Sequence, residues 1–115
     1  MTWSIRYSDG SANAYRFEPA GEGGVFDYDP VRPQQSSTGM YSGGDPRTGT
    51  LAAPALEALW RHVRALEGAT VLHVTDRMKG TGAFEISDED GTRAFIIRRG
   101  PELAAFDAFV AALAP

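Results

Sequence analysis

The 115-residue chain contains no cysteine and only two histidines, His62 and His73. Without thiols it cannot form disulfides, iron–sulfur clusters or cysteine-based zinc sites. A metal site built on the histidines would need both of them and a carboxylate, and their spacing matches no metal-binding motif. We therefore expect structural or exposed histidines, no metal and no cofactor. The missing cysteine also favours a reducing compartment.

The chain also has few basic residues and no long hydrophobic run. Lys and Arg number 11 against 15 Asp and Glu, a net charge of −4, whereas binding to a phosphate backbone requires clustered Lys and Arg. No apolar stretch approaches the roughly 18 residues that cross a bilayer. Residues 1–6 show no charged segment followed by an apolar run, so no secretion signal is visible. These features predict a cytoplasmic protein that binds neither nucleic acid nor membrane.

Sequence motifs for catalysis and for phosphate or calcium binding are missing as well. The chain has no Gly-x-Ser-x-Gly nucleophile elbow and no phosphate-binding loop. Residues 79–82 (Lys-Gly-Thr-Gly) precede a predicted strand rather than a helix, which indicates a tight turn. Residues 88–91 (Asp-Glu-Asp-Gly) lack the alternating oxygen ligands of a calcium loop and predict a polar hairpin tip. We name no catalytic residue and favour a protein that is not an enzyme.

Alternation of apolar and polar residues predicts about six strands. Residues 2–8 and 14–18 alternate with a period of two, which predicts a hairpin with an aromatic inner face and Arg6 and Arg16 outside. A short strand follows at 25–28. The remaining strands are predicted at 70–75, 83–87 and 92–98, the last two flanking the polar hairpin tip.

Apolar stripes at helical spacing predict two helices. The first runs from about residue 53 to 67, with Pro54 in its first turn and Gly68 at its end, and the second begins at Gly100-Pro101. We therefore predict a single α+β domain over residues 1–115. It has two layers: a mainly antiparallel sheet in the order β-β-β-loop-α-β-β-β-α, packed against two helices. Neither the strand order nor an oligomeric state follows from the sequence.

Residues 30–50 form a long Gly/Pro/Ser/Thr-rich segment without helical or strand periodicity. It holds four glycines, three prolines and six Ser or Thr, with Met40 and Tyr41 among the hydroxyls and glycines. A connection of this length in a compact domain is usually functional or disordered. Tyr41 is a typical anchor for a partner's pocket. The alternative is a flexible loop whose Met40 and Tyr41 pack inward.

Three functional hypotheses follow. The first is a non-enzymatic interaction domain that presents the 30–50 loop, and a sheet edge, to a protein or peptide partner. The second is a binder of a small anion or metabolite, or a weak hydrolase, in which backbone N–H groups of the loop form an anion nest beside Arg or Lys side chains. The candidate binding residues are Arg32, Ser36, Ser37, Tyr41, Ser42, Gly43, Gly44, Arg47, Arg77 and Lys79.

The third hypothesis comes from the order of the elements. The strand–loop–helix–hairpin–helix order over residues 25–113 resembles that of small bacterial inhibitors of thermolysin-type proteases. The resemblance implies an inhibitor or immunity protein whose loop enters the cleft of another enzyme. It rests on the order of elements and on no motif, so it assigns a role to no residue.

Overall fold

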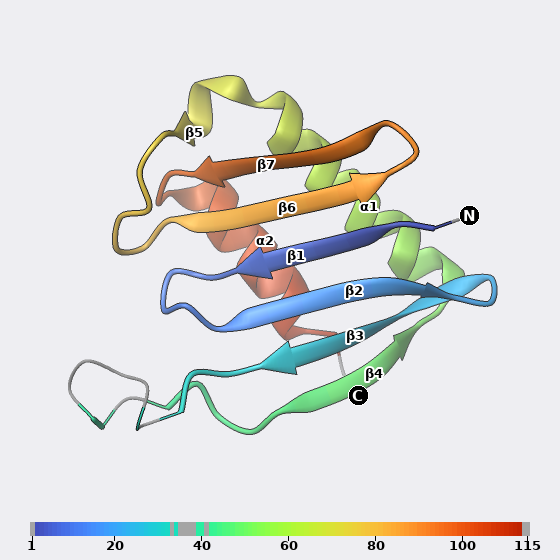
Figure 1. The fold of residues 1–115 in the computed structure, drawn as a ribbon, viewed down its shortest axis with the longest axis horizontal. Helices are drawn as coiled ribbons and strands as arrows, with labels where there is room; N and C mark the ends of the chain where they lie inside the picture. The colour runs from blue at the N-terminus through green and yellow to red at the C-terminus, as the bar shows by residue number, and fades with distance from the viewer. Residues whose placement is uncertain (1, 33, 35–38, 41, 114–115) are drawn as a thin grey trace.

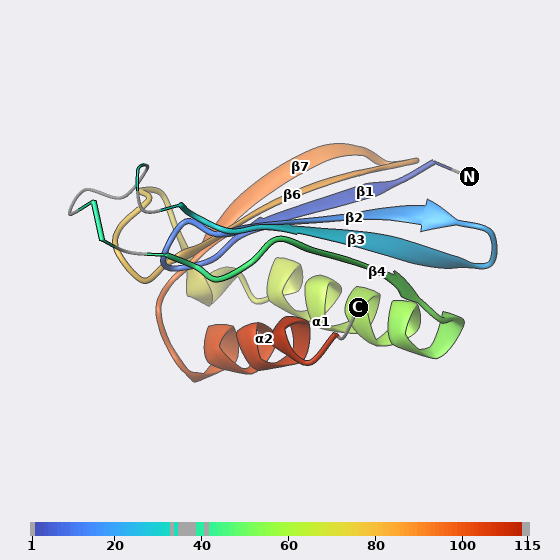
Figure 2. The ribbon, with the colours of Figure 1, turned by 90° about the horizontal axis from the view of Figure 1, so that it is seen from below.

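The computed structural model describes residues 2–32, 34, 39–40 and 42–113, and it shows an antiparallel sheet with two helices on one face (Figure 1, Figure 2). The helices are α1 (Ala53–Gly68) and α2 (Pro101–Ala111). The strands are β1 (Ser4–Ser8), β2 (Ala14–Ala20), β3 (Gly23–Asp29), β4 (Arg47–Leu51), β5 (His73–Val74), β6 (Gly82–Asp88) and β7 (Gly91–Ile97). The predicted two-layer α+β class is confirmed, with seven strands in the described chain rather than about six.

The strands lie in the order β4-β3-β2-β1-β6-β7-β5, and every neighbouring pair is antiparallel. The predicted hairpins β1–β2 and β6–β7 are both present. They meet through β1 and β6, which pair although they are far apart in the sequence. This pairing brings the turn after β1 to the same end of the sheet as the segment that leads into β6 (Figure 1).

Two strands differ from the sequence prediction. β4 begins within the segment expected to be a loop over 30–50, so the connection between β3 and β4 is shorter than predicted. Its Thr-Gly-Thr centre has a weak intrinsic preference for a strand, and the hydrogen-bonded pairing with β3 stabilises it there. The predicted strand 70–75 is instead a 3₁₀ turn (Thr70–Leu72) followed by the two residues of β5, which pair only with the end of β7.

The two faces of the sheet have opposite character. The helix-covered face holds the predicted aromatic side chains, including Tyr7, Tyr15 and Phe17, all buried. The open face carries a row of exposed charges. Arg6 pairs with Glu85 on one side and with Arg16 on the other, and Arg16 in turn faces Asp27. The hydrophobic core therefore lies between the sheet and the helices, and the open face is a solvated polar surface, as predicted.

The helices cover the core through their predicted apolar stripes. Buried residues are Leu59, Val63 and Leu66 on α1 and Leu103, Phe106 and Val110 on α2. Both histidines have structural contacts. His62 packs against Phe109 with ring centroids 4.6 Å apart, and His73 stacks on Phe95 at 4.9 Å. Among the described residues, neither helix is long and apolar enough to cross a membrane.

Arg93 ties the β6–β7 hairpin to α1. Its Nε donates to Glu67 Oε2 at 2.5 Å, and its Nη1 donates to Asp88 Oδ1 at 2.9 Å. The hydrogen bond from Arg93 holds the pKa of the Asp88 carboxyl below its ordinary value. Asp88 Oδ1 also accepts the N–H of Asp90, so the predicted polar hairpin tip is confirmed.

Candidate functional site: a charged cleft at the loop end of the sheet

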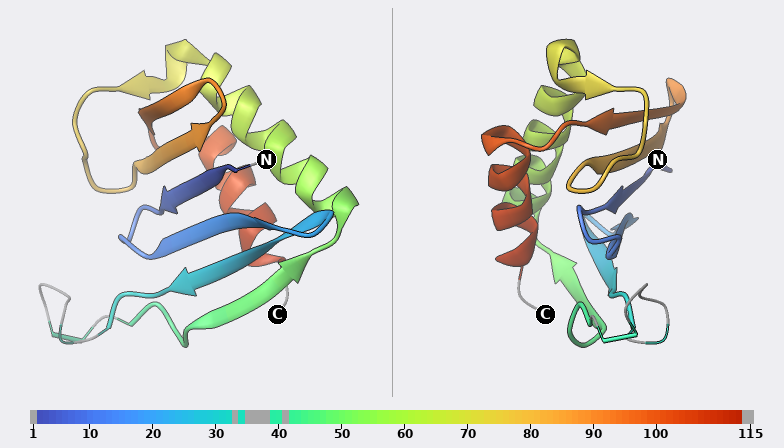
Figure 3. Two further views of the ribbon diagram at one scale, coloured as in Figure 1. Left: turned by 45° about the vertical axis from the view of Figure 1, so that its right-hand side comes forward. Right: turned by 90° about the vertical axis from the view of Figure 1, so that its left-hand side faces the viewer.

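An open cleft of about 740 Å³ lies where three connections meet at one end of the sheet. Its walls come from the β1–β2 turn (residues 9–11), from residues 79–80 before β6, and from the segment that runs from Arg99 into α2. Figure 3 (right) looks onto this end, with the helices on one side and the loops of the sheet on the other. The cleft therefore joins segments that are distant in the sequence.

Two glycines let the first two walls touch. A Cβ on Gly10 would lie 2.9 Å from the Cα of Gly80, so the backbones of the two turns approach too closely for side chains. Gly80 also has a φ of +86°, in the left-handed region that glycine occupies without strain. A Cβ on Gly80 would lie 2.9 Å from Arg99 Cδ. The stem of Arg99 thus packs directly over this glycine.

Arg77 clamps the same two turns together. Its Nη2 donates to Asp9 O at 2.7 Å and to Ser8 Oγ at 3.0 Å. Its Nη1 donates to Thr81 Oγ1 at 2.7 Å and also to the carbonyl of Thr81. Because both terminal nitrogens bind the protein's own oxygens, we assign Arg77 to building the cleft. The predicted anion-binding pair of Arg77 and Lys79 thus becomes one structural cation and one cation at the rim.

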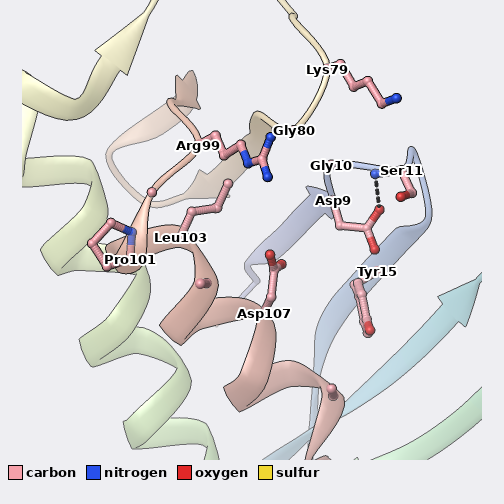
Figure 4. A pocket seen from close by; sticks show the side chains of 13 residues that line it. Asp9, Gly10, Ser11, Tyr15, Lys79, Gly80, Arg99, Pro101, Leu103 and Asp107 are labelled. Carbon is pink, nitrogen blue, oxygen red and sulfur yellow. Dashed lines mark hydrogen bonds between the residues drawn. The ribbon is translucent and has the colours of Figure 1, made fainter.

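Charges of both signs line the cleft (Figure 4). Arg99 stands at its upper edge, and Lys79 lies at the rim with its chain extending outward. The carboxylates of Asp9 and Asp107 face the same space from opposite sides. Among the described residues, none of these four side chains forms an ion pair within 4.0 Å; the ion pairs present join Arg93 to Glu67 and Asp88.

Asp107 lies at the base of the cleft and is held from below by a tyrosine. The buried Tyr7 hydroxyl donates a hydrogen bond to Asp107 Oδ1. Burial raises the pKa of the Asp107 carboxyl, the negative charge of Asp9 adds to this, and the hydrogen bond from Tyr7 opposes it. Burial, followed by the hydrogen bond and charge of Asp107, strongly raises the pKa of Tyr7. Tyr7 is therefore a permanent donor that orients Asp107, not a base.

Asp9 is fixed by the turn that it begins. Its Oδ1 accepts the N–H groups of Ser11 and Asn13, both at 2.9 Å, and its Oδ2 accepts from Asn13 Nδ2 at 3.0 Å. Asn13 is buried, and its Oδ1 accepts the N–H of Val31 at 2.8 Å. This amide therefore connects the turn beside the cleft to the start of the connection between β3 and β4.

The end of that connection is held at the same place. Gly43 N donates to Val31 O at 2.9 Å, and the Tyr28 hydroxyl donates to Gly43 O at 2.7 Å. A Cβ on Gly43 would lie 2.0 Å from Asn13 Oδ1, so only glycine fits there. Asn13 thus attaches the start of the predicted loop to the β1–β2 turn, and Val31 and Tyr28 hold Gly43, which has a structural role.

The predicted binding residues are not all brought to the cleft. Lys79 is the one that lines it. Arg47 is the first residue of β4, with its guanidinium carbon 4.8 Å from the centre of the Tyr28 ring. The remaining described candidates, Arg32, Ser42 and Gly44, are exposed, and Ser42 Oγ accepts the N–H of Gly44 at 3.2 Å. Ser36, Ser37 and Tyr41 lie outside the described residues.

The sequence prediction missed Asp9, Arg99 and Asp107. A signal was available for Asp107, because it follows Phe106 and lies four residues after Leu103, at the edge of the apolar stripe of α2. A carboxylate in that position either costs stability or has a partner. Asp9 and Arg99 carry no such signal, since a turn aspartate and an arginine after a strand are common surface residues.

The described residues contain no group of three or more His, Asp or Glu side chains arranged to hold a metal ion. No protein-family model matches the chain, and comparisons with curated proteins and with solved structures find no match. The geometry of the cleft is therefore the basis for a functional proposal.

Proposed function

We propose that this protein is a non-enzymatic binding domain that holds a small anionic metabolite in the cleft. The observation that carries the proposal is the pair of cations, Arg99 and Lys79, that line an open cleft without an ion-pair partner among the described residues. A carboxylate or phosphate of the ligand would fill this role, because a guanidinium binds either group through paired hydrogen bonds.

The start of α2 supports the same assignment. Pro101 is the first residue of this 11-residue helix. No side chain caps its N-terminus by a hydrogen bond, and the one acidic side chain of its first turn, Glu102, is exposed. The free N–H groups and the dipole of a helix N-terminus favour an anion. Because Arg99 stands just before this terminus and both line the cleft, a bound anion would meet the guanidinium and the helix together.

The positions of the two histidines and the protonation of Tyr7 favour binding over catalysis. Both histidines, which would be the first candidates for a general base, pack against phenylalanine rings away from the cleft. The raised pKa of Tyr7 keeps its hydroxyl protonated, so it cannot accept a proton from a nucleophile. Neither the two histidines nor Tyr7 can therefore serve as the general base that the weak-hydrolase alternative needs.

Replacing Arg99 by alanine tests the proposal, with Arg98→Ala as the matched control. Arg98 is the exposed neighbour and does not line the cleft. Inorganic phosphate, acetate, hexanoate and succinate are screened by thermal shift, and those that raise Tm are measured by calorimetry. We expect Arg99→Ala to weaken binding by about tenfold or more, the effect of one charged hydrogen bond. Arg98→Ala should bind as the wild type does.

Either of two results would contradict the proposal. The first is that none of these anions raises the Tm of the wild-type protein. The second is that Arg98→Ala and Arg99→Ala weaken binding equally, because the cleft would then contribute nothing beyond general positive charge.

One observation supports the hypothesis that this protein binds a protein or peptide partner, either as an interaction domain or as an inhibitor of another enzyme. β4 pairs with β3 along one edge and with no strand along its other edge within the described chain. It carries no lysine or proline, residues that commonly block an open edge. A peptide selected from a random library should then slow hydrogen exchange of the amides of β4, and Thr50→Lys should weaken its binding. Protection confined to other strands would exclude this edge.

A further inference from the structure

The two signs of charge in the cleft stand on different walls. Arg99 and Lys79 belong to the upper edge, before α2 and before β6, while Asp107 lies two turns into α2 and Asp9 faces it from the β1–β2 turn (Figure 4). Among the described residues no nitrogen–oxygen pair within 4.0 Å joins the two sets. Opposite charges that flank a cavity without touching leave room for a ligand that bridges them.

One carboxylate oxygen of Asp107 receives no hydrogen bond from the described residues. Tyr7 donates to its Oδ1, and Oδ2 accepts no hydrogen bond from any described residue. The carboxylate is half-buried and faces a second carboxylate, Asp9, across the cleft. A cationic group between the two would neutralise their repulsion and supply the missing donors.

We propose, on the premise that the cleft binds an anion, that its ligand is a zwitterion whose carboxylate lies at Arg99 and whose ammonium lies between Asp9 and Asp107. Pro101 and Asp107 are six residues apart on α2, a rise of about 9 Å along the helix axis. Because the anion would lie at the start of α2 and the ammonium two turns into it, we expect the two charges of the ligand to be separated by several bonds. This spacing favours a dipeptide or an ω-amino acid over an α-amino acid, whose charged groups share one carbon.

A series of matched ligands tests the proposal by calorimetry on the wild-type protein. The series comprises 6-aminohexanoate, glycylglycine, hexanoate without the amine, hexylamine without the carboxylate, and glycine. We expect 6-aminohexanoate or glycylglycine to bind at least about tenfold more tightly than hexanoate, hexylamine or glycine. The stronger of the two long zwitterions distinguishes an ω-amino acid from a peptide.

Asp107→Asn should remove this advantage, so that the long zwitterion binds no better than hexanoate. Asp76→Asn, an exposed aspartate in the segment before β6 that does not line the cleft, should retain it. A loss of binding in Asp107→Asn can be told apart from a loss of folding. The raised pKa of Asp107 means that its ionised form costs stability, a cost that appears as pH rises above the unfolded value. The asparagine variant is therefore expected to melt at or above the wild-type Tm at pH 7.

The outcomes separate this inference from the function on which it rests. Equal affinity for hexanoate and 6-aminohexanoate would overturn the zwitterion and leave the anion site in place. Equal affinity for glycine and for the long zwitterions would overturn the inferred separation of the ligand's two charges. Binding of hexylamine alone, or of none of the five ligands, would overturn the zwitterion. It would overturn the anion site as well if phosphate, acetate and succinate also fail to raise the Tm of the wild-type protein. If Asp76→Asn reduced the affinity for the long zwitterion as much as Asp107→Asn does, the zwitterion proposal would also be overturned.

Discussion

Replacing Phe106 by alanine is expected to lower the free energy of unfolding by about 3–5 kcal/mol, the range for truncating a buried aromatic side chain. Phe106 is 1% exposed and is the point where α2 meets the sheet. Its ring lies edge-on to Tyr7, with centroids 4.8 Å apart, and 5.1 Å from the centroid of Phe84. Because the neighbouring rings of Tyr7 and Phe84 also pack against each other, we expect them to fill little of the vacated volume, so that the loss falls within this range.

Phe106→Ala is also expected to weaken ligand binding in the cleft. Phe106 precedes Asp107, and Tyr7, which packs on Phe106, donates the hydrogen bond that orients the Asp107 carboxylate. Urea unfolding gives the stability loss, and ligand binding in the absence of urea gives the loss at the site. Phe109→Ala is the control, because Phe109 is only partly buried and its ring lies 6.4 Å from that of Phe106. A loss for Phe109→Ala as large as that for Phe106→Ala would contradict this account of the core.

The elements that the sequence predicts well are those whose pattern is local. Leu59, Val63 and Leu66 recur at helical spacing, and α1 runs to Gly68, one residue beyond the predicted end. Gly68 stands at the end of the helix, as predicted, although its φ is not in the left-handed region and Ala69 is the C-cap residue. The first hairpin is equally local, since alternation over 2–8 and 14–18 fixes which face is buried.

The elements that the sequence predicts poorly depend on distant partners. Thr48, Gly49 and Thr50 become a strand because β3 offers an edge with the matching register, with Asp27 opposite Thr48 and Val25 opposite Thr50. Nothing in the local sequence encodes that edge. In the same way the two residues of β5 are a strand only where β7 ends.

The cleft is a product of strand order, which the sequence does not reveal. Lys79 and Arg99 line the same cleft as Asp9 only because β6 pairs with β1. This pairing brings the ends of two hairpins together. The Gly-rich segment over 30–50 is conspicuous by composition, and it is attached to the same end of the sheet by hydrogen bonds that join Val31 to Asn13 and Gly43 to Val31 and Tyr28. Composition therefore pointed to the end of the sheet at which the cleft lies, while the charged side chains of the cleft come from other segments.

Glycine at position 82 is expected to be required by the packing beneath the cleft. Gly82 is buried at the start of β6, opposite Ile97. A Cβ there would lie 2.7 Å from Leu103 Cδ1 and 2.8 Å from Tyr7 Cε1. The leucine methyl can move, but the Tyr7 ring is buried among other rings and its hydroxyl is tied to Asp107. We expect Gly82→Ala to lower the free energy of unfolding by roughly 1–3 kcal/mol, as overpacking does.

Gly68→Ala is the matched control, with the opposite expected sign. A Cβ on Gly68 meets nothing within 4 Å, and the residue is helical, so alanine should raise stability by up to about 1 kcal/mol. Both variants are compared with wild type by urea unfolding, and their ligand binding is measured alongside. Gly82→Ala should also weaken binding, because any shift of Tyr7 moves the carboxylate that it orients. Wild-type stability for Gly82→Ala would mean that Tyr7 and Leu103 can move without cost, and the close packing inferred around Gly82 would then not be required.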